Sequence, residues 1–264
     1  MKPFLRWAGS KRRLIPYLRP HWNTSFSRFV EPFAGSASMF FELEPESALL
    51  ADVNLDLMNT YRVVRDNCDS LIEELYTLPI ACKETYLELR AKDPKTLTPL
   101  ASAARFVYLN RNCFNGLYRT NLKGQFNVPF SASAAGTLPL GAGIRACSVL
   151  LQRAELSLSS FDETLSLTRP GDFVYIDPPY VDSSTRIFKE YAADGFCQRR
   201  IDDLRSHLVR LAEENIFFVL SFTESDEGRF LGSGFSTQKV QVNRSIAGNA
   251  MHRRSVPELI ITPT

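Results

Sequence analysis

Short apolar runs alternate with helical patterns along the chain. Four runs rich in aromatic and aliphatic residues are bounded by Gly, Pro or acidic residues, as buried parallel strands usually are: residues 28–33, 47–52, 173–177 and 216–222. Residues 36–43, between the first two runs, have the period of a helix, with Ser36 as the expected N-cap. This strand, helix and strand predict an α/β fold with a doubly wound parallel sheet.

The middle of the chain has a different pattern. Residues 55–110 place apolar side chains at helical spacing, and residues 111–145 are rich in Asn, Gly, Ser and Pro, which is typical of loops and hairpins. The sheet is therefore expected to stop after its second strand, to give way to a mostly helical insert, and to resume near Ile144 and Arg145.

These patterns predict two domains. Residues 1–58 and 146–264 would form the sheet domain, and residues 59–145 would form the insert. Residues 235–262, near the end of the chain, look like two antiparallel strands joined by a long basic loop.

The composition of the 264 residues, 44% hydrophobic and 23% charged, is that of a globular protein. No apolar run approaches the roughly 18 residues that span a bilayer, and the charged N-terminus does not resemble a signal peptide. We therefore expect a cytoplasmic protein that needs neither a membrane nor an oligomer. Five cysteines without CxxC spacing and three scattered histidines argue against disulfides, a metal site and Ser/His/Asp chemistry.

The formal net charge of +2 conceals an uneven distribution of charge. Residues 1–30, 101–154 and 228–257 contain seven, six and five Lys or Arg residues, and none of these segments contains an acidic residue. If the three segments converge in space, they form a basic surface suited to a phosphate backbone. The alternative is that each is an ordinary solvated surface.

The strongest local motif follows the third apolar run. Asp177, Pro178, Pro179 and Tyr180 come directly after that run, and open α/β sheets bind ligands at this edge. The prolines fix the direction of the chain and hold the carboxylate and carbonyl groups outward.

This motif suits the methylation of an exocyclic amino group on a nucleobase. Such an amine is a poor nucleophile because its lone pair is delocalised into the ring. The Asp177 carboxylate and the Pro178 carbonyl could accept its two N–H bonds, and Tyr180 could stack on a base flipped out of the helix. The chain has no Pro-Cys dipeptide that would suggest a cysteine nucleophile.

A second motif follows the first apolar run. Residues 31–38 (EPFAGSAS) combine a tight turn with small residues, which lets the backbone approach a ligand, and Asp52 ends the next strand where a carboxylate commonly binds ribose hydroxyls. A purely geometric need for Gly and Ser in the turn is the alternative.

Several segments together resemble the Dam family (D12 class, alpha group) of DNA adenine-N6 methyltransferases, in the right order over nearly the whole chain. They are residues 4–11 (FLRWAGSK), 33–38 (FAGSAS), 108–119 (YLNRNCFNGLYR), 124–130 (GQFNVPF), 177–180 (DPPY) and 243–249 (NRSIAGN). The resemblance implies a Rossmann-like class I S-adenosylmethionine-dependent methyltransferase sheet with an inserted, mostly helical target-recognition domain.

The resemblance also implies roles for individual residues. The cofactor S-adenosylmethionine would be bound by Trp7, Lys11, Phe33, Ala34, Gly35, Ser36, Asp52, Phe161 and Asp177. Double-stranded DNA would be contacted by Arg6, Asn115, Leu117, Arg119, Pro129 and Arg244, with Arg119 reading a guanine edge and Arg244 positioning a phosphate. The alternatives are that Trp7 belongs to the core, that Arg6 and Lys11 are surface residues, and that Arg119 contacts phosphate.

The sequence departs from the family pattern in three places. Ser10 replaces a common glycine, Ser160 stands before Phe161 where many members have Asp, and residues 131–136 are small and neutral where the family is basic and aromatic. The last departure bears on the sequence that the enzyme would recognise.

We therefore predict a site-specific enzyme that flips adenine out of double-stranded DNA and methylates its N6. Arg119 and its loop imply GATC as the target. The alternatives are an enzyme of the same fold acting on cytosine N4 or on RNA, and a non-catalytic DNA-binding homologue.

Overall fold

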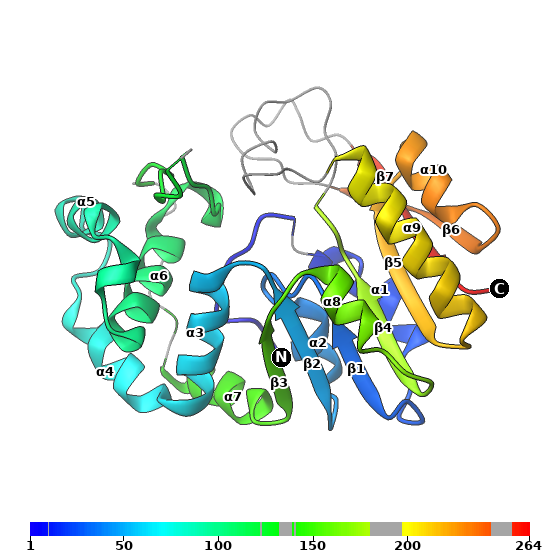
Figure 1. Ribbon diagram of the computed structural model, residues 1–264. Helices are drawn as coiled ribbons and strands as arrows, with labels where there is room; N and C mark the ends of the chain where they lie inside the picture. Colours follow the sequence, from blue (N-terminus) through cyan, green and yellow to red (C-terminus); the bar gives the residue numbers. More distant parts are fainter. Residues whose placement is uncertain (10, 122, 132–138, 140, 180–196, 244–254) are drawn as a thin grey trace.

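The computed structural model describes residues 1–264 except 10, 122, 132–138, 140, 180–196 and 244–254. The described residues form a seven-stranded sheet in the order β3-β2-β1-β4-β5-β7-β6 (Figure 1). The first five strands in chain order run parallel, and β7 runs antiparallel to both β5 and β6. The strands are β1 Arg28–Glu31, β2 Ala48–Asp52, β3 Ala154–Leu158, β4 Asp172–Ile176, β5 Phe217–Thr223, β6 Ser236–Asn243 and β7 Ser255–Thr262.

The helices cover both faces of the sheet and extend beyond its β3 edge (Figure 1). The α-helices are α1 Ile15–Leu18, α2 Ser38–Leu43, α3 Leu55–Asp66, α4 Cys68–Thr77, α5 Lys83–Ala91, α6 Pro99–Asn112, α7 Gly141–Leu151, α8 Phe161–Ser166, α9 Gln198–Glu213 and α10 Asp226–Gly232. The short 3-10 helices are η1 Lys11–Arg13, η2 Arg19–His21, η3 Pro94–Thr96 and η4 Phe114–Gly116.

The central strands are buried on both faces. Phe29 of β1 and Phe173 of β4 belong to one apolar cluster, shared with α1 to α7, whereas Val30 and Val174 belong to a second cluster under α8, α9 and α10. Successive side chains of a strand point to opposite faces, and a strand covered on both sides must therefore be apolar throughout. This double burial explains why the central strands appear in the sequence as continuous apolar runs.

The four predicted strands are confirmed as β1, β2, β4 and β5, but the predicted start of the first helix is wrong. Helix α2 begins at Ser38, with Ala37 at its N-cap in the left-handed conformation (φ 49°, ψ 38°). Ser36 makes no cap; its hydroxyl lies 2.9 Å from the hydroxyl of Ser38. The left-handed residue tightens the turn and moves the N-cap one residue along the chain, from Ser36 to Ala37.

The prediction for residues 55–110 is confirmed by α3, α4, α5 and α6, and isolated bridges between Cys113 and Phe130 and between Thr120 and Phe126 confirm a hairpin. The sheet resumes at Ala154 of β3, not near Ile144, which lies inside α7. Strand β3 is an edge strand with alternating burial, and its sequence AELSL alternates apolar and polar residues over only five positions, a short signal that the prediction missed.

The predicted domain boundaries lie within helices. Residue 58 lies in α3, which packs against β2 and β3 as well as α6 and α7, and residue 145 lies in α7. The division into residues 1–58 with 146–264 and residues 59–145 therefore stays a prediction. The antiparallel pair near the end of the chain is confirmed as β6 and β7, and its loop lies outside the described residues.

All five cysteines are free thiols. In the part of the chain that the structure describes, no helix is both long and apolar enough to cross a membrane. Nor do the described residues hold three or more His, Cys, Asp or Glu side chains in a group that could bind a metal ion.

Candidate active site

Three carboxylates meet at one edge of the sheet, where the parallel strands end. Glu31 ends β1, Asp52 ends β2, and Asp177 follows β4. The chain leaves β1 toward β2 on one side and reaches β4 on the other, so this edge is the point where the strand order reverses. Doubly wound sheets bind their ligands at this point.

Asp177 is held by polar groups from two other elements. Its Oδ1 lies 3.3 Å from Nζ of Lys11 and accepts a hydrogen bond of 3.2 Å from the hydroxyl of Ser221 on β5. The Ser221 hydroxyl lies 3.2 Å from the hydroxyl of the buried Tyr175. The side chain of Asp177 keeps 22% exposure, so its carboxylate is fixed in direction and still accessible.

The surroundings of Asp177 shift the pKa of its carboxylate in both directions. Burial and the carboxylate of Glu258 raise the pKa of Asp177, whereas Lys11 and the Ser221 hydroxyl lower it; the balance is a pKa of about 6. The carboxylate is therefore ionised at neutral pH but poised close to protonation.

The turn after β1 is packed tightly against the N-terminal segment. Gly35 has φ +47°, and a Cβ at this position would lie 2.9 Å from Cδ1 and Nε1 of Trp7. Its N–H donates to Oδ2 of Asp52 (3.0 Å), and its carbonyl accepts from the hydroxyl of Tyr61 (2.6 Å). Ala34 and Ser36, on either side of Gly35, are buried.

Trp7 packs against the apolar core, which was one of the two roles considered for it, and its contact with the cofactor stays a prediction. Its ring stacks on Tyr118 (centroids 5.9 Å apart) and packs against the apolar core, while one edge covers Gly35. The core contact fixes the ring over the turn.

Glu31 is a buried carboxylate within the same cluster. It is 2% exposed, the N–H of Phe40 donates to it, and its Oε2 has no hydrogen-bond partner among the described residues. Burial and the charges of Asp177 and Asp52 raise its pKa well above the usual value. An unpaired buried oxygen at a ligand-binding edge indicates a missing polar partner.

An aromatic pair borders the site beside the end of β1. Phe33 and Phe161 pack with centroids 5.2 Å apart, and the guanidinium of Arg200 lies 4.2 Å from the centre of the Phe161 ring. Asp162 pairs with Arg200 (2.6 Å) and with His207 (3.0 Å), so it faces α9. Ser160 forms a capping box with Glu163 and starts α8.

Those predicted DNA-contacting residues that the structure describes gather around α6 and the hairpin that follows it. The backbone N–H of Arg6 donates to the Asn110 side chain (2.9 Å), and that side chain donates back to the Arg6 carbonyl (2.7 Å). Arg6 also lies close enough to Arg111 to lower the pKa of that guanidinium, although burial is the larger cause. Two of the acid-free segments therefore meet here.

Arg119 is oriented by the opposite arm of the hairpin. Its Nε donates to Oδ1 of Asn127 (2.8 Å), and the N–H of Asn127 donates to the Arg119 carbonyl (3.0 Å). Asn115 is exposed with φ +56°, Pro129 is exposed, and Leu117 is half-buried. The structure thus brings these residues onto one hairpin.

The structure adds residues that the sequence did not single out. Ser221 contacts Asp177, Glu258 contacts Lys11, and Tyr61 contacts the Gly35 turn. Among the predicted residues, Pro178 is buried and Pro179 is exposed. Tyr180 and Arg244 lie outside the described residues.

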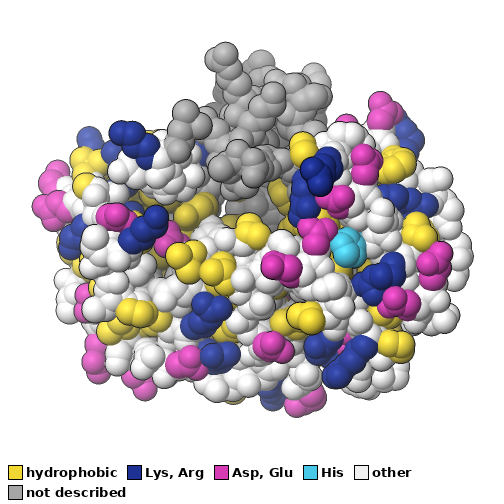
Figure 2. Space-filling view, viewed as in Figure 1, with side chains coloured by type: hydrophobic (Ala, Val, Ile, Leu, Met, Phe, Trp, Pro, Cys, Tyr) yellow, Lys and Arg dark blue, Asp and Glu magenta, His cyan; other side chains and the backbone are white. Residues whose placement is uncertain are grey.

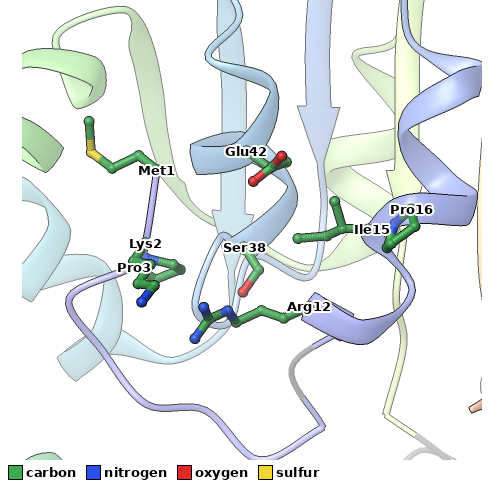
Figure 3. Close-up of a pocket in the computed structure, with 8 residues that line it drawn as sticks. All are labelled: Met1, Lys2, Pro3, Arg12, Ile15, Pro16, Ser38 and Glu42. Carbon is green, nitrogen blue, oxygen red and sulfur yellow. The ribbon is translucent and has the colours of Figure 1, made fainter.

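Two further surface features lie outside this site. A cavity of about 370 Å³ is bordered by the N-terminal segment, η1, α1 and α2, and Figure 3 shows Arg12 reaching across it toward Ser38. None of its lining residues belongs to the predicted site. On the face shown in Figure 2, Lys and Arg side chains are interspersed with Asp and Glu, so this face carries no continuous basic patch.

The strand order, the reversed β7 and the ligand-binding edge agree with a Rossmann-like methyltransferase fold. Residues 7–246 match the D12 class N6 adenine-specific DNA methyltransferase family. The chain belongs to this family, and it is a DNA adenine methyltransferase.

Individual relatives agree with the family match. The chain is 34% identical to the type II methyltransferase M1.LlaDCHI of Lactococcus lactis subsp. cremoris, over 99% of this chain and 95% of the relative. It is 33% identical to the retron Ec67 DNA adenine methylase of Escherichia coli (98% and 90%) and 32% identical to a DNA adenine methylase of Vibrio cholerae (98% and 95%). These comparisons favour adenine in DNA over the alternatives of cytosine and RNA.

Proposed function

We propose that the chain transfers a methyl group from S-adenosylmethionine to N6 of an adenine flipped out of double-stranded DNA, with Asp177 as the catalytic residue. The observation that carries this proposal is the position of Asp177. Its carboxylate stands at the end of β4, fixed by Lys11 and Ser221 and still partly exposed.

The residues at this edge fit S-adenosylmethionine. The aromatic pair of Phe33 and Phe161 offers apolar surface beside a nucleoside ring, and Asp52 stands where a ribose hydroxyl would be bound. The unpaired oxygen of Glu31 could accept from an ammonium group, and Lys11 could pair with a carboxylate. When bound, S-adenosylmethionine supplies an electrophilic methyl group on a sulfonium.

The chain would act on the adenine through hydrogen-bond acceptors. Asp177 Oδ and the Pro178 carbonyl would accept the two N–H bonds of the adenine N6, which draws the lone pair out of conjugation with the ring. Asp177 would then accept the proton that N6 loses on methylation and pass it to solvent. The tight turn at Gly35, covered by Trp7, would keep the donor in place.

The test is Asp177→Asn, which preserves the shape of the side chain but removes its charge. We expect transfer of labelled methyl groups into DNA to fall by about 10²–10⁴-fold, while cofactor binding, measured by calorimetry, persists. Asp226→Asn changes an exposed carboxylate on α10 and should leave the rate unchanged. Undiminished transfer by Asp177→Asn would remove Asp177 from the mechanism.

We further propose GATC as the target, by analogy with the family motif around Arg119. The support is that Asn127 orients the Arg119 guanidinium on the same hairpin as Asn115, Leu117 and Pro129. Methylated adenines would be mapped in DNA from a host that lacks adenine methylation and expresses the protein. Unmodified GATC sites would refute the assignment.

A further inference from the structure

Two carboxylates from different elements share the cation of Lys11. Its Nζ lies 3.3 Å from Oδ1 of Asp177 and 3.6 Å from Oε2 of Glu258. Lys11 is 8% exposed and Glu258 is 2% exposed. A buried carboxylate is costly to retain unless it is paired, and the proposed function makes no use of Glu258.

The sheet fixes the position of Glu258. In strand β7 it stands opposite Thr223 of β5 and Val240 of β6, so it lies on a strand that is paired on both sides. Lys11, in contrast, lies in the three-residue helix η1, shortly after Gly9 with φ +81°. The carboxylate of Glu258 therefore lies on a rigid strand. The side chain of Lys11 is flexible, so the groups that it pairs with determine its direction.

We infer that Glu258 is a positioning residue for methyl transfer: it shares the Lys11 ammonium with Asp177, which loosens the pair between Lys11 and Asp177 and so sets the charge that Asp177 presents to the target amine. This inference rests on the proposed catalytic role of Asp177. Glu258 acts through Lys11 and is not expected to touch the adenine.

The sign of the effect follows from the groups around Asp177. They are Lys11 from η1, Glu258 from β7, Glu31 from β1, Ser221 from β5 and Tyr175 from β4. Of these described groups only Lys11 is cationic. The Glu258 charge raises the pKa of Asp177 and Lys11 lowers it. Removing the Glu258 charge ends this repulsion and leaves one carboxylate fewer to compete with Asp177 for Lys11, and both changes lower the pKa of Asp177.

The test is the pH dependence of kcat/KM for Glu258→Gln, which keeps the size of the side chain but loses its charge. We expect the acid limb to move to lower pH by about 0.5–1 unit, and kcat at pH 8 to fall about tenfold because a more tightly paired Asp177 is a weaker acceptor. An acid limb that stays in place or moves to higher pH overturns the inference.

A matched control is available on the neighbouring strand. Glu224 lies just after β5, and its carboxylate forms an ion pair with Nζ of Lys239 (2.6 Å). Its backbone N–H donates to the carbonyl of Pro257, the residue before Glu258. Glu224→Gln removes a charge from the same part of the sheet without touching Lys11. Its pH profile should coincide with that of the unmodified protein.

Two further comparisons keep the outcome decisive. If Glu258→Gln does not fold, Glu258→Asp keeps the charge but sets it back by one methylene; its acid limb should lie below that of the unmodified protein, and an unchanged limb contradicts the inference. If Asp177→Asn is inactive while Glu258→Gln has an unchanged profile, this inference fails and the proposed function stands. If Asp177→Asn stays active, the proposed function fails first.

Discussion

In the proposed mechanism, the ionised carboxylate of Asp177, at the end of strand β4, accepts an N–H bond from adenine. Burial raises its pKa to about 6, against the opposing effect of Lys11. Because protonation removes an acceptor, methyl transfer should be present above pH 6 and should be lost as the pH falls through this value. The measurement is kcat/KM from pH 5 to 9, with circular dichroism at each pH to show that the fold persists. An acid limb near pH 4, the range of an ordinary aspartate, would contradict this reading.

Gly35 is a second residue on which the site depends. Gly35→Ala would place a methyl group 2.9 Å from Trp7 and force a side chain into the left-handed region. We expect a loss of stability of about 1–3 kcal/mol and cofactor affinity reduced by at least about tenfold, because the turn and the Trp7 ring must separate. Thermal unfolding and calorimetric titration measure the two effects.

Gly143→Ala is the control for that change. Gly143 lies inside α7 with open space around it, so the substitution should raise stability by about 0.5–1 kcal/mol and leave cofactor affinity unchanged. Equal effects at both positions would mean that the Gly35 turn has no special role in binding.

At the scale of elements, a contact within the hairpin of residues 113–130 orients the guanidinium of Arg119. Arg119→Lys keeps the charge but loses the planar fork that Asn127 orients. If Arg119 reads a guanine, discrimination at one base pair should fall by about 1–3 kcal/mol. Competition among duplexes that differ at single positions measures this loss, with Arg145→Lys, an exposed residue paired with Asp69, as the control. Uniform weakening on all duplexes would instead indicate a phosphate contact.

The elements also show what the sequence could predict. Strands β1 and β4 are buried on both faces, so their sequences are continuous apolar runs and were predicted correctly. Strand β3 alternates apolar and polar residues over only five positions, and this short signal was missed. The left-handed Ala37 before helix α2 does not follow from residue periodicity. Local sequence patterns therefore predict which strands are buried, but they do not predict the backbone conformation of a turn.

The same limit applies to the candidate site. Asp177, Gly35 and Asp52 stand at the ends of predicted strands, so a motif beside a strand was enough to single them out. Glu258 and Ser221 reach the site through strand pairing between β5 and β7, which is a long-range contact. The sequence signal for both residues was a polar side chain within a largely apolar strand. Only the order of the strands in the sheet shows that these side chains lie near Asp177 and Lys11.

At the scale of the whole molecule, the structure brings together parts of the three acid-free segments, as the sequence analysis considered. Arg6 of the first segment and Arg111 of the second meet beside α6, and Lys11 reaches Glu258 next to the third segment. On the face shown in Figure 2, however, the charges are mixed in sign.

The most direct test of the central claim is a crystal structure of the protein with a DNA duplex and a non-reactive analogue of the methyl donor. The account predicts an everted adenine with N6 within about 3.2 Å of both a carboxylate oxygen of Asp177 and the Pro178 carbonyl oxygen. An adenine that remains stacked in the duplex, or one that is bound away from the end of β4, would contradict it.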